Sequence, residues 1–209
     1  MIQCPQSEIL DMPQGSDEWF TERIGSIGGS SIASVVAKGE GKMRKNLLFR
    51  LAGEILTGVK YEGFKNDHMD RGIEQESEAR IRYELVTGNE VVQVGLVKLT
   101  DYKHESPDGL VGKDGKIEIK CVIPSVQVET IIADKVPANY RKQVQWGLFI
   151  CERQWCDFIS YSPLVTSRPM WIKRVERDEK LIKELDEGAD KFIKEMLKIL
   201  DTITMKGDA

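Results

Sequence analysis

The sequence predicts one α/β domain over residues 1–209, with a helical first quarter, a mixed middle part and a long C-terminal helix. Three observations lead to this fold class. Helix caps follow one another through the first quarter, β-branched runs and a hairpin pattern occupy the middle, and apolar residues recur at helical spacing near the end. A chain of 209 residues that is 41% hydrophobic can bury the core of one such domain.

Helices are predicted before the first strand because each segment carries a start or a stop signal. Ser16 precedes DEWFTERI as an N-cap with acidic residues in the first turn, and Gly25 terminates this helix. A glycine-rich turn then leads to a second helix that begins near Ser30. The same signals predict a third helix over residues 42–56 and a fourth over residues 69–88.

The middle part alternates strands and helices. Strands are predicted for EVVQVGLVKL (90–99), for the hairpin DGLVGKDGKIEIKC (108–121) and for WCDFISYSP (155–163). The segment SVQVETIIA is ambiguous between strand and helix, whereas residues 136–151 are predicted to form a helix with Pro137 near its start. The basic segment RPMWIKRVER (168–177) is interpreted as a solvated helix face.

The end of the chain predicts a long amphipathic helix from Asp178 to Ile203. Its apolar residues recur every three or four positions: Leu181, Leu185, Ala189, Phe192, Met196 and Ile199. This stripe can pack on the domain or on another subunit.

Composition excludes several classes of protein. The net charge of −4 does not favour a protein that holds nucleic acid by overall charge, so such contacts would have to use local clusters of basic residues. The four cysteines form no CxxC pair and no secretory leader precedes them, which predicts neither a disulfide framework nor a zinc site. No apolar run is long enough to cross a membrane, and we expect an intracellular protein with reduced cysteines.

The hairpin concentrates charge within a few residues. In KIEIKC, strict alternation places Glu118 and Lys120 on one face of a strand. Two turns are compatible with the sequence. A two-residue turn at 114–115 sends Asp108 to the opposite face, whereas a three-residue loop at 113–115 pairs Asp108 with Lys120 and gathers all three charges on one face.

Two carboxylates beside an ammonium suit a hard cation such as Mg²⁺, which prefers oxygen ligands and keeps several waters. A metal lowers the pKa of bound water from about 15.7 toward ~7, and a neighbouring lysine can orient that water or help to deprotonate it. The alternative is an exposed hairpin with a cross-strand ion pair that contributes roughly 0.2 to 1 kcal/mol.

Glu76 lies on the apolar stripe of the fourth predicted helix, so its carboxylate needs a partner. A metal ion is one such partner. A salt bridge to Arg80, one turn further along the helix, is the other.

Three blocks in this order, RGIEQESEAR, SPDGLVGKDGKIEIK and YRKQVQW, resemble the phage lambda exonuclease and YqaJ-like viral recombinase branch of the PD-(D/E)xK nucleases. The resemblance extends from Trp19 to about Tyr161. It implies a restriction-endonuclease-like fold, in which a mixed central sheet is flanked by helices, and metal-dependent hydrolysis of DNA.

The resemblance also implies roles for single residues. Asp108 and Glu118 would bind Mg²⁺, for which Mn²⁺ can substitute, with Glu76 and the Ile119 carbonyl completing the metal site. Lys120 would position or activate the water. Gln143 resembles a glutamine that orders this site, and Gln145 is the nearby competitor for that role.

The block WFTERIGSIGGSS resembles the family's 5′-phosphate pocket, with Arg23 and Ser30 as anchors and Ser106 as a further serine. A glycine-rich turn before a helix offers free N–H groups, and arginine can clamp phosphate oxygens in pairs. Two departures from the family pattern stand out. Gly28-Gly29 replace the Thr-Ala that relatives often carry, and the proline expected directly after Lys-Cys comes only at Pro124.

The implied activity is a Mg²⁺-dependent 5′ to 3′ exonuclease that digests one strand of linear double-stranded DNA and leaves a 3′ single-stranded overhang for recombination. The implied partners are a single-strand annealing protein and two further copies of the chain, because such enzymes form homotrimer rings around DNA. The alternatives are a PD-(D/E)xK endonuclease or single-strand exonuclease, and a non-catalytic DNA-end-binding subunit. The intact Asp108, Glu118 and Lys120 disfavour the last, because carboxylates repel phosphate unless a metal is present.

Overall fold

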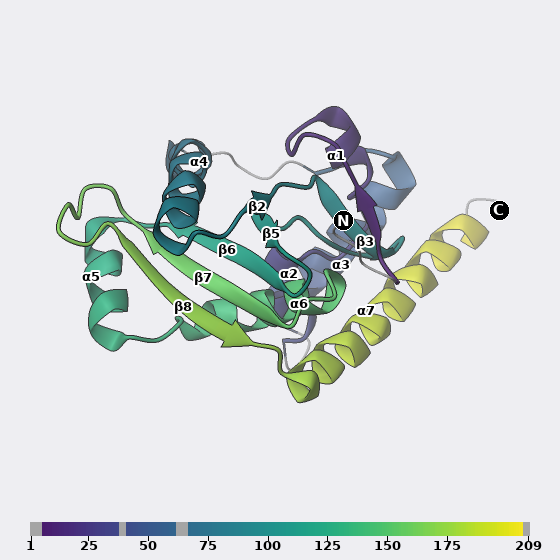
Figure 1. Cartoon of the computed structure of the whole chain (residues 1–209). Helices are drawn as coiled ribbons and strands as arrows, with labels where there is room; N and C mark the ends of the chain where they lie inside the picture. Colours follow the sequence, from purple (N-terminus) through teal and green to yellow (C-terminus); the bar gives the residue numbers. More distant parts are fainter. Residues whose placement is uncertain (1–5, 38–40, 62–66, 207–209) are drawn as a thin grey trace.

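A five-stranded mixed sheet forms the centre of the computed structural model, which describes residues 6–37, 41–61 and 67–206 (Figure 1). The strand order is β2-β5-β6-β7-β8, with β6 and β7 parallel and the other neighbours antiparallel. These strands are β2 (Val91–Val92), β5 (Gly109–Val111), β6 (Gly115–Cys121), β7 (Trp155–Tyr161) and β8 (Met170–Glu176). A smaller antiparallel sheet has the order β1-β3-β4 and consists of β1 (Glu8–Leu10), β3 (Leu96–Thr100) and β4 (Lys103–Glu105).

Helices cover both faces of the central sheet (Figure 1). They are α1 (Asp17–Thr21), α2 (Gly29–Val35), α3 (Lys42–Thr57), α4 (Asp67–Thr87), α5 (Pro124–Ala133), α6 (Arg141–Ile150, preceded by a 3₁₀ turn at Ala138–Tyr140) and α7 (Glu179–Lys206). On one face, Ala79 and Tyr83 of α4 pack on Ile117 and Ile119 of β6. On the other face, α6 packs against the sheet and against α2, so β6 lies between α4 and α6.

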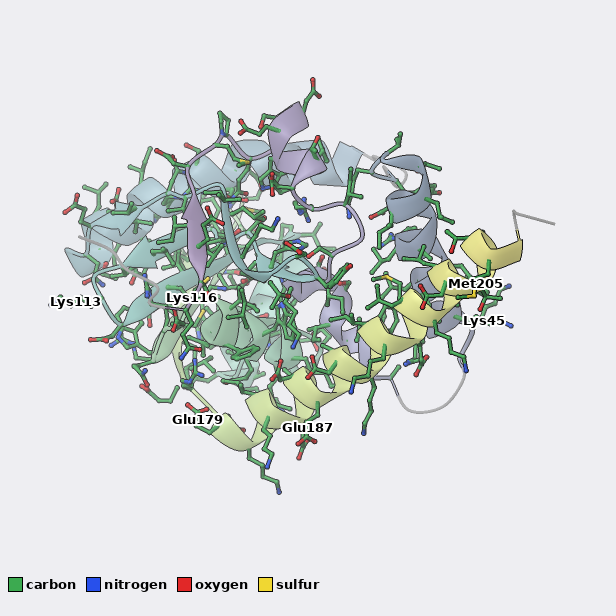
Figure 2. All side chains as sticks on the ribbon, turned by 90° about the vertical axis from the view of Figure 1, so that its right-hand side faces the viewer. Lys45, Lys113, Lys116, Glu179, Glu187 and Met205 are labelled. Atoms are coloured by element: carbon green, nitrogen blue, oxygen red, sulfur yellow. The ribbon has the colours of Figure 1, made fainter. Side chains whose placement is uncertain are left out.

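Helix α7 is a long amphipathic helix that packs on α3, α2 and α6. Its buried stripe includes Leu185, Ala189, Phe192 and Met196, as the spacing of the apolar residues predicts. Figure 2 shows α7 along its length, from Glu179 at one end to Met205 at the other. The prediction of a long C-terminal helix is confirmed. No helix in the described ranges has the length and apolar character that crossing a membrane requires.

Several local predictions are also confirmed. The Ser16 side chain accepts a hydrogen bond from the backbone N–H of Trp19, as predicted. The predicted end of this helix is wrong, because α1 stops at Thr21 with Glu22 as its C-cap, and Gly25, with a φ of +63°, lies in the turn that follows. Helix α3 ends at Gly58 with a φ of +66°. The ambiguous segment after the hairpin is the helix α5, in which Pro124 occupies the first turn.

The prediction of one strand over residues 90–99 is wrong, because this segment forms two strands in different sheets. β2 pairs with β5 of the central sheet, whereas β3 pairs with β1 and β4. Gly95 marks the break. A Cβ atom there would lie 2.2 Å from the carbonyl oxygen of Met12, so only glycine admits that segment.

The basic segment 168–177 is not a helix face but contains β8, an edge strand paired with β7. Edge strands expose polar and charged side chains, which explains why its composition did not indicate a strand. β1 and β4 were not predicted either. Both are three residues long, too short to show alternation.

Candidate active site

The β5–β6 hairpin forms with a three-residue loop, but with a register that neither predicted turn gives. Leu110 pairs with Lys116 and Val111 with Gly115, so the loop is residues 112–114, and the predicted pairing of Asp108 with Lys120 is wrong by two residues. Gly112 takes the left-handed conformation, with a φ of +54°. Gly115 lies in the strand instead, where a Cβ would approach the Trp155 ring to 2.3 Å. A shift in register of two residues leaves every side chain on the same face of the sheet, because successive side chains alternate between the two faces. Glu118 and Lys120 therefore lie on one face, as predicted.

Glu118 is the most connected residue of the hairpin and is 2% exposed. Its Oε1 lies 2.7 Å from Lys120 Nζ and accepts a hydrogen bond from Gln143 Nε2 at 2.7 Å. Its Oε2 accepts from Lys116 Nζ at 3.1 Å. Burial alone would raise the pKa of Glu118, but the two ammonium groups lower it to about 2. Glu118 is therefore an anion held on both oxygens.

Asp108 immediately precedes β5 and reaches β6 through its side chain. Its Oδ2 accepts the backbone N–H of Ile119 at 2.6 Å. Burial and the nearby carboxylates of Glu118 and Glu76 raise the pKa of Asp108 to about 8. Burial lowers the pKa of Lys120, but Glu118 and Asp108 together raise it above its usual value, so Lys120 is an ammonium ion.

Glu76 approaches this group from α4, on the opposite face of the sheet from α6. Arg80 Nη2 lies 2.6 Å from Glu76 Oε1, and Arg80 Nε donates to the carbonyl oxygen of Asp108 at 2.9 Å. The salt bridge considered as the alternative partner of Glu76 is thus formed. Burial and the charge of Glu118 nevertheless raise the pKa of Glu76. Glu76 is therefore held by Arg80 and also belongs to the carboxylate group.

The donor chemistry of this group fits a hard divalent cation. Asp108, Glu76 and Glu118 supply carboxylate oxygens, and burial, followed by the charges of Glu118 and Glu76, raises the pKa of Asp108. The described residues contain no group of three His, Cys, Asp or Glu side chains already arranged as a ligand shell. Two of the three carboxylates are instead paired with cations, Glu76 with Arg80 and Glu118 with Lys120.

Gln143 and Gln145, the two candidates on α6, face different parts of the structure. Gln143 donates to Glu118. Gln145 donates to the Glu176 carbonyl and accepts from the Asp178 backbone N–H, so it joins α6 to the segment before α7. The structure therefore places Gln143 in the carboxylate group and Gln145 outside it.

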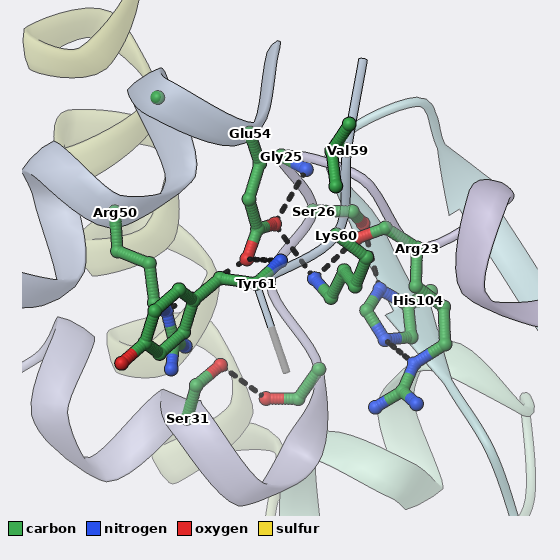
Figure 3. A network of polar contacts seen from close by, with 12 residues as sticks. Arg23, Gly25, Ser26, Ser31, Arg50, Glu54, Val59, Lys60, Tyr61 and His104 are labelled. Carbon is green, nitrogen blue, oxygen red and sulfur yellow. Dashed lines mark hydrogen bonds and ion pairs between the residues drawn. The ribbon is translucent and has the colours of Figure 1, made fainter. Parts of the chain in front are cut away.

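A cationic group lies at the other end of the site, after α1. The guanidinium carbon of Arg23 stacks 3.6 Å from the Trp19 ring centroid, and its Nε donates to His104 Nε2 at 3.1 Å (Figure 3). Since His104 Nε2 accepts, its Nδ1 carries the proton and donates to Ser26 Oγ at 2.7 Å. Burial, and then the positive charges of Arg23, Lys60 and Lys98, lower the pKa of His104 well below its usual value. His104 is therefore a neutral acceptor that orients Arg23.

Arg23 itself is short of negative partners. Among the residues whose positions the structure gives, no carboxylate lies in salt-bridge contact with it. Burial lowers its pKa to about 10, which the more distant Glu105 and Glu54 only partly offset. A partly buried guanidinium without a carboxylate in salt-bridge contact can bind an anion.

The segment that follows α3 is fastened beside Arg23 by Glu54 (Figure 3). Glu54 is 2% exposed and accepts from the Gly25 backbone N–H at 3.0 Å and from Lys60 Nζ at 2.8 Å. Lys60 also donates to the Arg23 carbonyl at 2.7 Å. Tyr61 is held by its backbone and exposes its ring, which Arg50 faces. This network fixes the backbone that carries Arg23.

One cleft of about 1140 Å³ joins the two ends. Arg23 and Ser30 line it together with Glu76 and Asp108, so residues predicted for the 5′-phosphate pocket and for the metal site face the same space. Ser106 accepts a hydrogen bond from Trp19 Nε1 at 3.1 Å and so supports the ring on which Arg23 stacks.

One backbone N–H of the Gly28-Gly29 turn is already occupied. The N–H of Gly29 donates to Glu105 Oε2 at 3.1 Å, so this group is not free for an anion. The glycines themselves have a steric reason. A Cβ at Gly28 would lie 2.6 Å from His104 Nε2, and a Cβ at Gly29 would lie 2.5 Å from Glu105 Oε2.

Sequence reasoning missed His104, Glu105 and Lys116, which all contact residues predicted for the site. Alternation in β6 does place Lys116 on the same face as Glu118, so a signal for that residue was present. His104 and Glu105 lie on a strand too short to predict.

Comparison with known proteins places the chain in a family. The model of the YqaJ-like viral recombinase domain matches residues 18–154. Two structures of an alkaline exonuclease from Laribacter hongkongensis, one of them in complex with dAMP, match with TM-scores of 0.85 and 0.86 and identities of 35% and 36%. In both cases the match covers 92% of this chain and 98% of the exonuclease.

A phage-related exonuclease from Haemophilus somnus 129PT shares the fold, with a TM-score of 0.63 and 16% identity over 85% of this chain and 96% of that chain. Among curated proteins, no sequence matches this one. The fold is thus the restriction-endonuclease-like fold that the sequence predicts, and the chain belongs to the YqaJ-like viral recombinase domain family.

Proposed function

We propose that this protein is a metal-dependent exonuclease that digests one strand of linear double-stranded DNA from its 5′ end and leaves a 3′ single-stranded overhang for recombination. One observation carries the proposal: a single cleft is lined at one end by Arg23 and Ser30 and at the other by Asp108 and Glu76. An anion bound at Arg23 therefore shares a cavity with the carboxylate group. The similarity to an alkaline exonuclease supports the same activity.

In the proposed reaction, Asp108, Glu118 and Glu76, with the Ile119 carbonyl, hold Mg²⁺, for which Mn²⁺ can substitute. The metal supplies a Lewis acid for the phosphate and lowers the pKa of bound water. Lys120, which pairs with Glu118 through a 2.7 Å contact, would position or activate the water. Gln143 keeps Glu118 in place through its 2.7 Å hydrogen bond.

Arg23 and Ser30 bind the terminal 5′-phosphate in this proposal. Trp19 and His104 fix the guanidinium from its face and from Nε, which leaves the two Nη groups to donate to phosphate oxygens. Ser106 acts through Trp19. Phosphate binding at a fixed distance from the carboxylate group selects the nucleotide to be removed.

The protein is further proposed to act as a homotrimer ring, together with a single-strand annealing protein, in the cytoplasm of a bacterium or phage-infected host. The net charge of −4 supports a ring, because enclosure retains DNA without a basic surface. Light scattering coupled to size exclusion checks this part, and a monomer at micromolar concentration contradicts it.

The central test uses linear duplex DNA labelled on either strand end, with 5′-phosphate or 5′-hydroxyl termini, and closed circular DNA. Each substrate is incubated with Mg²⁺ or with chelator. We expect release of nucleotides from the 5′ end of linear DNA, faster for phosphorylated ends and absent with chelator. Cleavage of circular DNA would show an endonuclease instead, and release from the 3′ end would overturn the polarity.

A further inference from the structure

A second lysine contacts Glu118 from inside the protein. Lys116 precedes Glu118 by two residues on the same face of β6 and is 0% exposed. Its Nζ lies 3.1 Å from Glu118 Oε2 and 3.4 Å from Glu105 Oε1. Figure 2 shows it among the side chains around the sheet, whereas Lys113 in the hairpin loop is exposed. The proposed reaction uses Lys120 and gives Lys116 no task.

The surroundings of Lys116 are shaped around its ammonium group. A Cβ atom at Gly147 of α6 would lie 2.3 Å from Lys116 Nζ and 3.0 Å from Glu105 Oε1. Glu105 is itself fastened, since it accepts the N–H of Gly29. A buried cation is retained only with close anionic partners, and both partners here are nearly inaccessible to water.

We propose that Lys116 is a positioning residue for Glu118. Its ammonium holds Oε2 on the buried side of the carboxylate, so that Oε1 stays turned toward Lys120 and Gln143. The inference rests on the proposed function, in which Glu118 is a metal ligand. Groups behind a metal ligand fix its orientation, and their loss commonly lowers metal affinity about 10- to 100-fold.

Charge neutralisation is the competing explanation, because Lys116 also balances Glu105 and Glu118. The double variant Lys116→Met/Glu105→Gln separates the two explanations, since it removes one positive and one negative charge with little change in shape. It leaves Glu118 paired with Lys120 but without a partner on Oε2. Neutralisation predicts that this variant binds metal normally, whereas positioning predicts that it folds and binds metal weakly.

The experiment measures Mn²⁺ binding by calorimetry on the protein without DNA, together with the melting temperature and the kcat on linear duplex DNA. The double variant should lose about 10- to 100-fold in Mn²⁺ affinity. Lys103→Met is the matched control: Lys103 is another buried lysine with two carboxylate partners, Asp186 and Asp190 of α7, outside the cleft. It should lower the melting temperature and leave Mn²⁺ affinity unchanged.

Gly147→Ala provides a second route, because the added methyl displaces the tip of a flexible side chain without altering any charge. It should also weaken Mn²⁺ binding. If the double variant does not fold, Gly147→Ala distinguishes positioning from charge neutralisation. Wild-type Mn²⁺ affinity in the folded double variant, or in Gly147→Ala, overturns the positioning role. A wild type that binds no Mn²⁺ and digests DNA with chelator present contradicts the proposed function itself, which is a different outcome.

Discussion

The two ends of the cleft hold their charges in different ways. At the acidic end, Glu118 is held by Lys116 and Lys120, and Glu76 by Arg80. At the cationic end, Arg23 is held by an indole ring and a neutral imidazole. At the acidic end, cationic side chains of the protein thus neutralise most of the negative charge. At the cationic end, uncharged groups orient the guanidinium and do not neutralise its charge. The acidic end is therefore pre-arranged, whereas the cationic end presents an oriented guanidinium that an anion can bind.

Asp108 is the exception within the acidic end. Its Oδ2 accepts the Ile119 backbone N–H, and its pKa is raised to about 8. The carboxyl group therefore keeps its proton near neutral pH and needs no cation beside it. A metal ion would replace that proton. Among the described residues, Asp108 at the acidic end and Arg23 at the cationic end have no ion-pair partner, and both line the cleft.

Removing the Asp108 carboxyl group from the acidic end should give the largest effect. Asp108→Asn copies the shape of the protonated side chain that burial favours, so the fold should persist. The digestion rate should fall by roughly 100-fold or more, since a bound metal contributes several kcal/mol to the transition state. Release of acid-soluble nucleotides measures the rate, and a gel shift checks DNA binding. A rate close to wild type would remove Asp108 from the metal site.

Removing the unbalanced charge of the cationic end should act on one kind of DNA end. Arg23→Ala should slow digestion of 5′-phosphorylated DNA toward the rate for 5′-hydroxyl DNA, because a charge-assisted contact contributes about 1.5 to 3 kcal/mol, or roughly 10- to 100-fold. Arg50→Ala, which removes a cation from the same cleft, should lower both rates equally. Equal losses in the Arg23 variant would assign it to general DNA binding.

The two glutamines of α6 test whether the acidic end is arranged in advance. Gln143→Ala should lower kcat about tenfold with little change in melting temperature, because it removes one of the two groups that hold Oε1 of Glu118. Gln145→Ala should do the reverse, lowering the free energy of unfolding by about 1 to 3 kcal/mol while the folded fraction digests DNA normally. An exchange of these two outcomes would overturn the placement of Gln143.

Glu76 belongs to both a salt bridge and the carboxylate group, and Glu76→Gln distinguishes the two. As a metal ligand, it should raise the Mg²⁺ concentration needed for the half-maximal rate several-fold. As a partner of Arg80 alone, it should lower the melting temperature and leave the Mg²⁺ titration unchanged. A titration of the initial rate against Mg²⁺ for both proteins measures the difference.

The smallest effect concerns His104 and pH. Its pKa is depressed in the folded protein, so below the ordinary value of about 6.5 the unfolded chain takes up a proton that the folded protein refuses. The free energy of unfolding should therefore decline by up to about 1.4 kcal/mol per pH unit between pH 6.5 and 5. In His104→Gln this part of the decline should vanish, as urea unfolding at several pH values would show. An unchanged pH profile would mean that His104 is protonated in the fold.

The sequence was most informative where structure is local. Alternation placed Glu118 and Lys120 on one face, and caps such as Ser16 were recognisable because their hydrogen bonds lie within one turn. The register of the hairpin depended on Trp155, which is distant in the sequence, and the break in residues 90–99 depended on Met12. Such contacts cannot be read from a segment alone.

In the candidate site, too, local features were predictable and contacts between distant segments were not. The spacing of Asp108, Glu118 and Lys120 left a metal site and an exposed ion pair open, and the resemblance to a family gave these residues, Gln143 and Arg23 their roles. Asp108 and Arg23 line the cleft, and Lys120 and Gln143 contact Glu118; the roles stay predictions. The burial of Lys116 and the hydrogen bond from Arg23 to His104 required the packing of α6 and α1 on the strands. Alternation predicts the face of the sheet to which a strand residue points but not how deeply its side chain is buried.

The Gly28-Gly29 turn limits the order in which this protein can have evolved. The imidazole of His104 and the carboxylate of Glu105 occupy the space that side chains at 28 and 29 would need, and both are held in place by further partners. A large residue at 104 or 105 could be accepted only after the facing position had become glycine. Once both were in place, the glycines could not revert without prior change at the strand. Positions 28 and 104, and positions 29 and 105, should therefore vary together among homologues.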